Sequence, residues 1–143
     1  MHKLIAGSFA AAAAAIAPAL AQSEQHWSAV DRITLTSTGA LTIAGDRMSF
    51  GTDGSIHVEL VAAHIRGRWS ETNERTEGDI YKVDPPAKPT SPRGDVLCDQ
   101  PATYIVLSYP VPGDLDLSVY TASDRPKGDG SDKACATFSY TEG

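Results

Sequence analysis

Five polar residues in the middle of the chain are the first candidates for chemistry: His57, Glu59, His64, Arg66 and Arg68. A serine hydrolase needs a histidine base beside an exposed serine, and the Gly-x-Ser-x-Gly turn that presents such a serine does not occur in the sequence. Zinc needs three or four converging ligands. On a strand His57 and Glu59 share a face, whereas His64 takes the other. No metal site is predicted here, and an enzyme that uses His57, His64, Arg66 and Arg68 is kept as the alternative hypothesis.

Three aspartates, Asp124, Asp129 and Asp132, lie in the polar, glycine-rich stretch of residues 123–133. Carboxylates in such a loop can bind calcium, but the Asp-x-Asp-x-Asp-Gly spacing of an EF-hand is absent. A glycine-rich phosphate loop and a dinucleotide fingerprint are absent too. We therefore predict no bound metal and no cofactor. Loop side chains can reach outward without disturbing a core, and we expect these three aspartates to contact a partner.

The charge is negative and unevenly distributed. The chain has a formal net charge of −6 at pH 7. Residues 94–143 contain eight acidic and three basic residues, whereas residues 22–93 contain ten acidic and eight basic ones. Such a balance argues against nucleic acid or an anionic lipid surface as a partner. It favours a cationic partner for the C-terminal half.

The first 21 residues have the pattern of an export signal. A basic start at Lys3 precedes an apolar run with six consecutive alanines at residues 10–15, and the run ends at Ala19-Leu20-Ala21. A basic start, a short apolar run and a small-x-small exit are typical of a secretory signal peptide. The run is shorter than the roughly 20 residues that a membrane-spanning helix needs. We expect a signal peptide over residues 1–21, a single domain over residues 22–143, no membrane span, and a bacterial periplasmic or secreted location.

Cys98 and Cys135 are the two cysteines of the chain. In an oxidising compartment two cysteines are expected to pair. Closing the loop between them would stabilise the fold by about 4 kcal/mol through the lost entropy of the unfolded chain.

Eight short stretches separated by Gly, Pro and Asp have the pattern of β-strands. Most alternate apolar and polar residues, as a half-buried strand does, and residues 115–120 are expected to have one wet face. Residues 102–109 are apolar on both faces and should be covered on both sides. The expected strands are residues 32–36, 41–43, 47–50, 55–64, 79–83, 102–109, 115–120 and 134–140. The sequence predicts an all-β domain, a small antiparallel β-barrel or sandwich of about eight strands with one disulfide.

Within this framework, a few positions predict faces, turns and connections. Ile56, Val58 and Leu60 are expected on the inward face of their strand. Asp53-Gly54 predicts a tight hairpin turn, because such a turn needs positive φ angles. Residues 84–93 contain four prolines and are expected to form an extended connection outside the sheet.

The C-terminal half resembles uncharacterised small exported bacterial β-rich proteins. The resemblance rests on short elements that cover about a third of the chain: Leu97-Cys98, Thr103-Tyr104-Ile105, Leu115-x-Leu117-x-Val119 and Cys135-x-Thr137-Phe138-x-Tyr140. That group has no established activity and implies no functional residue. In size and architecture the chain is also similar to lipocalin-like barrels and to periplasmic inhibitors of lysozyme or proteases, but at Trp27 the lipocalin Gly-x-Trp is missing, because Gln25-His26 precedes it.

These observations favour a binding protein over an enzyme. We expect an exported, non-enzymatic binding module for an unknown protein or small ligand, and inhibition of a cationic hydrolase is one such role. The alternative is a small exported enzyme that uses the region of His57, His64, Arg66 and Arg68. Convergence of these four side chains and Glu59 in one pocket would favour the enzyme.

Overall fold

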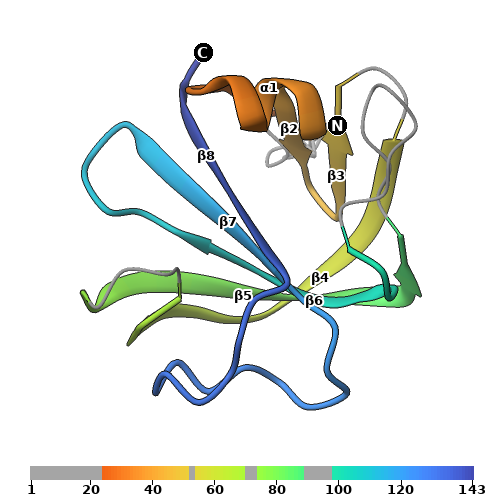
Figure 1. The fold of residues 1–143 in the computed structure, drawn as a ribbon, viewed down its shortest axis with the longest axis vertical. Coiled ribbons are helices and arrows are strands. Elements are labelled where there is room, and N and C mark those ends of the chain that lie inside the picture. The colour runs from red at the N-terminus through yellow and green to blue at the C-terminus, as the bar shows by residue number, and fades with distance from the viewer. Residues whose placement is uncertain (1–23, 52–53, 70–73, 89–97) are drawn as a thin grey trace, which may run out of the picture.

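A closed antiparallel barrel of eight strands forms the whole domain (Figure 1). The computed structural model describes residues 24–51, 54–69, 74–88 and 98–143. Each strand pairs with the next along the chain, and β1 pairs with β8 to close the barrel. The elements are β1 (Gln25–Ala29), α1 (Arg32–Ser37), β2 (Leu41–Ala44), β3 (Arg47–Phe50), β4 (Gly54–Gly67), β5 (Thr76–Ala87), β6 (Ala102–Ser108), β7 (Asp114–Tyr120) and β8 (Ala136–Glu142). The predicted barrel is confirmed, and its alternative, the sandwich, is wrong.

Two sequence predictions fall outside this description. The predicted signal peptide over residues 1–21 lies outside the described residues, and so does Asp53 of the predicted hairpin turn. Within the described ranges, no helix has the length and apolar character that crossing a membrane requires.

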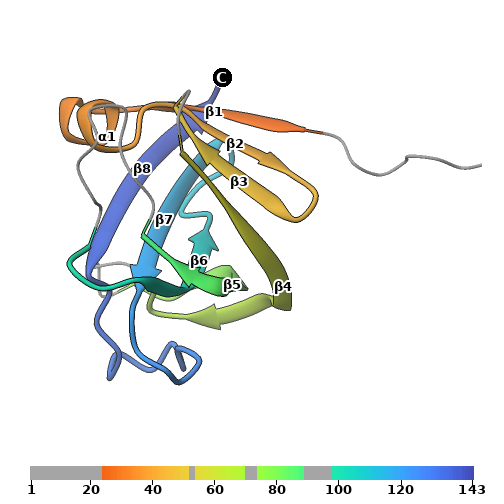
Figure 2. The ribbon, with the colours of Figure 1, turned by 90° about the vertical axis from the view of Figure 1, so that its right-hand side faces the viewer.

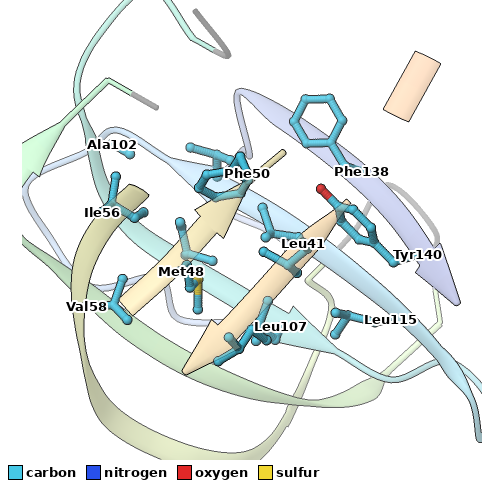
Figure 3. Close-up of a cluster of buried hydrophobic side chains, with 14 of the residues drawn as sticks. Leu41, Met48, Phe50, Ile56, Val58, Ala102, Leu107, Leu115, Phe138 and Tyr140 are labelled. Carbon is cyan, nitrogen blue, oxygen red and sulfur yellow. The ribbon is translucent and has the colours of Figure 1, made fainter. Parts of the chain in front are cut away.

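Apolar side chains from all around the barrel fill its interior (Figure 3). Residues two apart on a strand point to the same face, so the alternating strands each contribute an inward row. Leu41, Met48, Leu107, Leu115 and Tyr140 are among the fully buried members. Full burial of one such side chain contributes about 1.5–3 kcal/mol, so this interior is the main source of stability.

A second, smaller apolar cluster lies on the outside of the sheet, and we call it the outer cluster. Its buried members are Trp69, Ile80, Val106 and Tyr120. It explains why β6 is apolar on both faces, because Val106 points outward into this cluster while its neighbours point into the barrel. The prediction that the outer face of β7 is exposed to water is wrong, since Ser118 and Tyr120 on that face are both buried.

Hydrogen bonds fix Trp69 at the centre of the outer cluster. The indole Nε1–H lies 3.0 Å from the carbonyl oxygen of Ile65 and 3.1 Å from that of Thr76 and donates to both. The hydroxyl of Tyr120 donates to the carbonyl oxygen of Trp69 at 2.9 Å. Burial and the charge of Asp132 raise the pKa of Tyr120 to about 12, so this hydroxyl keeps its proton and remains a donor.

Residues 121–135 form a long connection that crosses the outer cluster, at the bottom of Figures 1 and 2. The amide of Arg68 donates to the carbonyl oxygen of Gly128 at 2.9 Å. Gly128 has a φ of +75°, and a Cβ at this position would overlap the Trp69 ring. Only glycine combines this backbone angle with such a close approach, so the connection is held against the barrel by a specific contact.

Residues 32–36 form the helix α1, and the strand predicted there is wrong. The side chain of Asp31 caps the helix by accepting the Thr34 amide at 2.7 Å, as N-cap residues do. The apolar residues that suggested a strand point to solvent: Ile33 is 72% and Leu35 59% exposed. Thr34 is the buried one, and its hydroxyl accepts the amide of Ser139 at 3.2 Å on β8. The helix therefore packs on β8 through a polar contact (Figure 2), and β1, which carried no strand prediction, takes the remaining place in the barrel.

β4 extends beyond its predicted end and bends twice. Its register with β5 shifts between Leu60 and Ala62 and again between Ala62 and Ile65. Ile56 and Val58 are buried as predicted, but Leu60 on the same face is 50% exposed. The barrel is therefore less completely filled at this end.

β5 continues through two prolines that were expected outside the sheet. Ala87 pairs with Ala102 on β6, so the prediction of a connection outside the sheet is wrong for residues 84–87. Pro85 and Pro86 lie where the register between the two strands is irregular, and proline, which cannot donate to a strand ladder, is tolerated at such interruptions. From residue 89 the predicted connection lies outside the described residues.

The predicted disulfide between Cys98 and Cys135 is present. Cys98 is buried and packs against the core, whereas Cys135 is exposed and directly precedes β8. The bond links the segment before β6 to the segment before β8 across 37 residues. Such a bond is compatible with an oxidising compartment outside the cytoplasm.

Candidate binding site at the barrel mouth

The structure separates the histidines that the sequence singled out. His57 Nε2 lies 2.9 Å from Asp46 Oδ2, and its Nδ1 lies 3.1 Å from the carbonyl oxygen of Asp84. His64 Nδ1 lies 3.7 Å from Glu77 Oε2. Seven residues of strand span about 20 Å, so the two imidazoles belong to different surroundings. Each is engaged by its own carboxylate.

The two arginines of the enzyme hypothesis lie at the end of β4 and directly after it. Arg66 is opposite Glu77 in the pairing of β4 with β5. The side chain of Arg68 lies beside Gly130 of the long connection. Among the described residues, no three His, Cys, Asp or Glu side chains are grouped as metal ligands. The structure therefore separates His57 from the other three residues, whereas His64 and Arg66 both lie beside Glu77.

Two of the three loop aspartates accept hydrogen bonds within their own loop. Asp129 accepts the amide of Ser131 at 2.9 Å, and Asp132 accepts the amide of Lys127 at 2.6 Å. Hydrogen bonds from the Ser131 hydroxyl and amide hold the pKa of Asp129 below its usual range. Asp124 is exposed. The same loop carries three basic residues, Arg125, Lys127 and Lys133. The loop is thus locally neutral, and contact of these aspartates with a partner stays a prediction.

A different acidic residue lies at the open end of the barrel. Asp79, Tyr81 and Val83 alternate along β5, and Val83 is buried in the core, so all three point inward. The hydroxyl of Tyr109, in the turn after β6, donates to Asp79 Oδ2 at 3.4 Å. The Tyr109 ring lies 6.4 Å from the Trp27 ring, centroid to centroid, at an interplanar angle of 46°. We call Trp27, Asp79, Tyr81 and Tyr109 the mouth cluster.

The mouth cluster is in part exposed to solvent, although Trp27 itself is buried. Leu60 is opposite Tyr81 in the strand register and shares its inward face, yet it is half-exposed. Tyr109 is also partly exposed. The β4–β5 hairpin and the β6–β7 turn project on the same side, at the left of Figure 1. They are joined there by a hydrogen bond of 3.4 Å from the Tyr109 amide to the Glu77 carbonyl.

Asp79 also fixes the backbone at the rim. Its Oδ1 accepts the amide of His64 at 3.0 Å. His64 has a φ of +57°, a left-handed conformation that is uncommon for a residue with a side chain. This strained residue lies within the irregular part of β4, between Ala62 and Ile65. The carboxylate of Asp79 therefore holds the bend that opens the mouth.

The electrostatics of the mouth cluster suit a cation. Burial first, then the negative charge of Asp79, raise the pKa values of Tyr109 and Tyr81, so both phenols stay neutral donors. Two carboxylate oxygens have about four acceptor positions, and the described contacts of Asp79 use two. An ammonium or guanidinium group can bind such a carboxylate while it lies against aromatic faces.

One further carboxylate lies at this end. Glu142 is opposite Trp27 in the pairing of β8 with β1. Its side chain lies against Gly113, where an added Cβ would be 3.6 Å from Oε2. A cation that approaches the mouth therefore meets negative charge at the rim as well as at Asp79.

The sequence held a signal for this site. Asp79 occupies the inward register of a strand whose next inward residues are Tyr81 and Val83. An acidic side chain in an inward row is expensive unless it is hydrogen-bonded or functional. The neighbouring Tyr109 could not be assigned in the same way, because it lies in a turn after the strand.

No protein-family model, no curated protein and no solved structure matches this chain.

Proposed function

We propose that this protein is an exported binding module whose barrel mouth receives a cationic side chain of a partner protein. The observation that carries the proposal is the position of Asp79, which faces inward among Tyr81, Tyr109 and Trp27 at the half-exposed end of the barrel. A lysine or arginine of the partner would pair with the carboxylate and lie against the rings. Inhibition of a basic hydrolase is the role that this geometry favours.

Three features support recognition of a cation. A cation over an aromatic ring contributes about 0.5–2 kcal/mol, and more when water is excluded. Hydrogen bonds to a charged group are roughly twice as strong as neutral ones. The chain is acidic overall, with a formal net charge of −6, and a field of one sign speeds the encounter with an oppositely charged partner.

Export is the second part of the proposal. The leader pattern of residues 1–21 supports transport out of the cytoplasm. The disulfide between Cys98 and Cys135 supports an oxidising destination, either the bacterial periplasm or the medium. A partner encountered there would be another envelope or secreted protein.

The effect of Asp79→Asn on peptide binding tests the site. Calorimetry would compare a short peptide that carries one arginine between apolar residues with the same peptide carrying citrulline. We expect wild type to prefer the arginine peptide, and Asp79→Asn to bind it about tenfold more weakly, which is about 1.4 kcal/mol. The asparagine keeps an oxygen for the His64 amide, so the bend at the rim is preserved.

The matched control is the triple variant Asp124→Asn, Asp129→Asn, Asp132→Asn, which removes three charges far along the chain. We expect it to lose part of the salt-sensitive association rate, and therefore to weaken binding of the arginine peptide much less than Asp79→Asn does. Loss of affinity in the triple variant with none in Asp79→Asn would place the contact on the loop. Turnover of a substrate that is lost on mutation of His57 or His64 would replace the binding module with an enzyme.

A further inference from the structure

A second concave site lies on the outside of the barrel, separate from the mouth. A groove of about 290 Å³ opens between the outer face of β4 and β5 and the long connection that crosses it. Its lining is Ala62, Ile65, Ile80, Arg125, Pro126 and Lys127. We infer that this groove binds a small amphipathic carboxylate, with its apolar tail on the strand residues and its carboxylate between Arg125 and Lys127.

The floor of the groove is apolar because of the bend in β4. Ala62 is opposite Ile80 in the register with β5, and Ile65 is opposite Gly78. The register shifts on either side of Ala62, so β4 presents Ala62 and Ile65 together on its outer side. Ala62 is small, and a larger residue at this position of the lining would fill the groove. Burial of the apolar tail of a ligand on this floor is favourable in proportion to the apolar area removed from water.

The backbone that carries the two cations is fixed in place. Pro126 is buried. The amide of Lys127 donates to Asp132 Oδ2 at 2.6 Å, and the carbonyl oxygen of Gly128 accepts the Arg68 amide. Arg125 and Lys127 are therefore presented from a held segment, and their exposed side chains can close over a ligand.

The charges at the rim select the ligand. Within the described ranges, no carboxylate lies within ion-pair distance of the Arg125 or Lys127 side chains. Asp129 interacts with Lys127 through space while its own Oδ1 is held by Ser131, and Asp132 Oδ2 accepts the Lys127 amide. Two adjacent cations repel a cationic ligand and attract an anion. The volume lies at the lower limit of small-molecule sites, which are about 300–1,000 Å³, so a medium-chain acid fits better than a larger lipid.

Octanoate is the probe that tests the groove. Calorimetry and amide chemical shifts would be measured with octanoate, with acetate (the carboxylate alone) and with octyltrimethylammonium (the tail with the opposite charge). We expect saturable binding of octanoate only, with shifts in Ala62, Ile65 and Lys127. Equal binding of the ammonium compound, or no saturation by octanoate at millimolar concentration, would overturn the inference.

Three variants separate charge from shape. Arg125→Gln with Lys127→Gln should weaken octanoate at least tenfold. Ala62→Leu should abolish binding by filling the groove, with both cations left in place. Lys133→Gln removes a charge from the same loop, outside the groove lining, and should bind octanoate as wild type does. A loss in Lys133→Gln equal to that in the double variant would show a nonspecific charge effect and refute the site. Retention of wild-type binding in Ala62→Leu would refute it as well.

Discussion

Replacement of Trp69 by alanine is expected to lower the free energy of unfolding by about 3–5 kcal/mol, as truncation of a fully buried tryptophan does. Trp69 is 2% exposed and is the largest residue of the outer cluster. Its indole contacts Gly67 and Gly128, and its Nε1–H is bonded to two carbonyl oxygens. Removal of the ring leaves a cavity and two acceptors without their donor. Urea unfolding followed by circular dichroism measures the effect.

A second substitution at the same place gives a sharper test. A Cβ on Gly78 would lie 2.6 Å from Trp69 Nε1 and 2.9 Å from Val106 Cγ1, so Gly78→Ala should cost about 1–3 kcal/mol through overpacking. In the Trp69→Ala background the same change should cost less, because the indole no longer opposes it. Equal costs in both backgrounds would mean that Trp69 and Gly78 do not press on each other.

Loss of the disulfide is the second large effect. We expect Cys98→Ala with Cys135→Ala to lower the free energy of unfolding by about 2–5 kcal/mol. The bond closes a separation of 37 residues, and its removal frees the unfolded chain more than the folded one. Chemical denaturation of the oxidised wild type, the reduced wild type and the double variant measures the effect.

The two altered forms should agree with each other. Reduced wild type and the double variant both lack the bond, and the alanine at position 98 removes only a small side chain from the edge of the core. An unchanged denaturation midpoint in either form would contradict a stabilising role for the bond. Since the bond lies before β6, and Tyr109 lies after that strand, binding at the mouth should persist in the variant at temperatures where it is folded.

The sequence predicts correctly those strands in which the alternating apolar residues are also the residues that the barrel buries. Leu115, Leu117 and Val119 alternate and all point into the barrel, so β7 is where the pattern places it. The disulfide follows in the same way, because a chain with two cysteines in an oxidising compartment has one pairing available. Met48 and Phe50 are likewise buried on one face of β3, as their spacing indicates.

The elements that were predicted wrongly are those in which a tertiary contact overrides the local sequence pattern. The alternation of Ile33 and Leu35 resembles a strand, but the cap at Asp31 and the buried Thr34 stabilise a helix instead. The pattern of β7 does not reveal that Tyr120 is covered, because the cover comes from Trp69, about fifty residues earlier. No local pattern encodes such a contact.

The candidate site was missed for a related reason. The sequence draws attention to histidines and to clustered aspartates, since their types suggest chemistry without any fold. The role of Asp79 as a candidate binding residue becomes visible only in the closed barrel, where Tyr109 donates to it and Trp27 lies beside Tyr109. From the sequence alone, the place of Asp79 in the inward row with Tyr81 and Val83 is the available signal, and that signal does not show which residues it meets.

Amide chemical-shift mapping of the labelled protein during titration with the arginine peptide tests the central claim most directly. The account predicts that the shifting amides are those around the mouth, namely Leu60, Asp79, Tyr81 and Tyr109, and that the shifts disappear with the citrulline peptide. Shifts concentrated at Asp124, Asp129 and Asp132, with none at Asp79 and Tyr109, would contradict it.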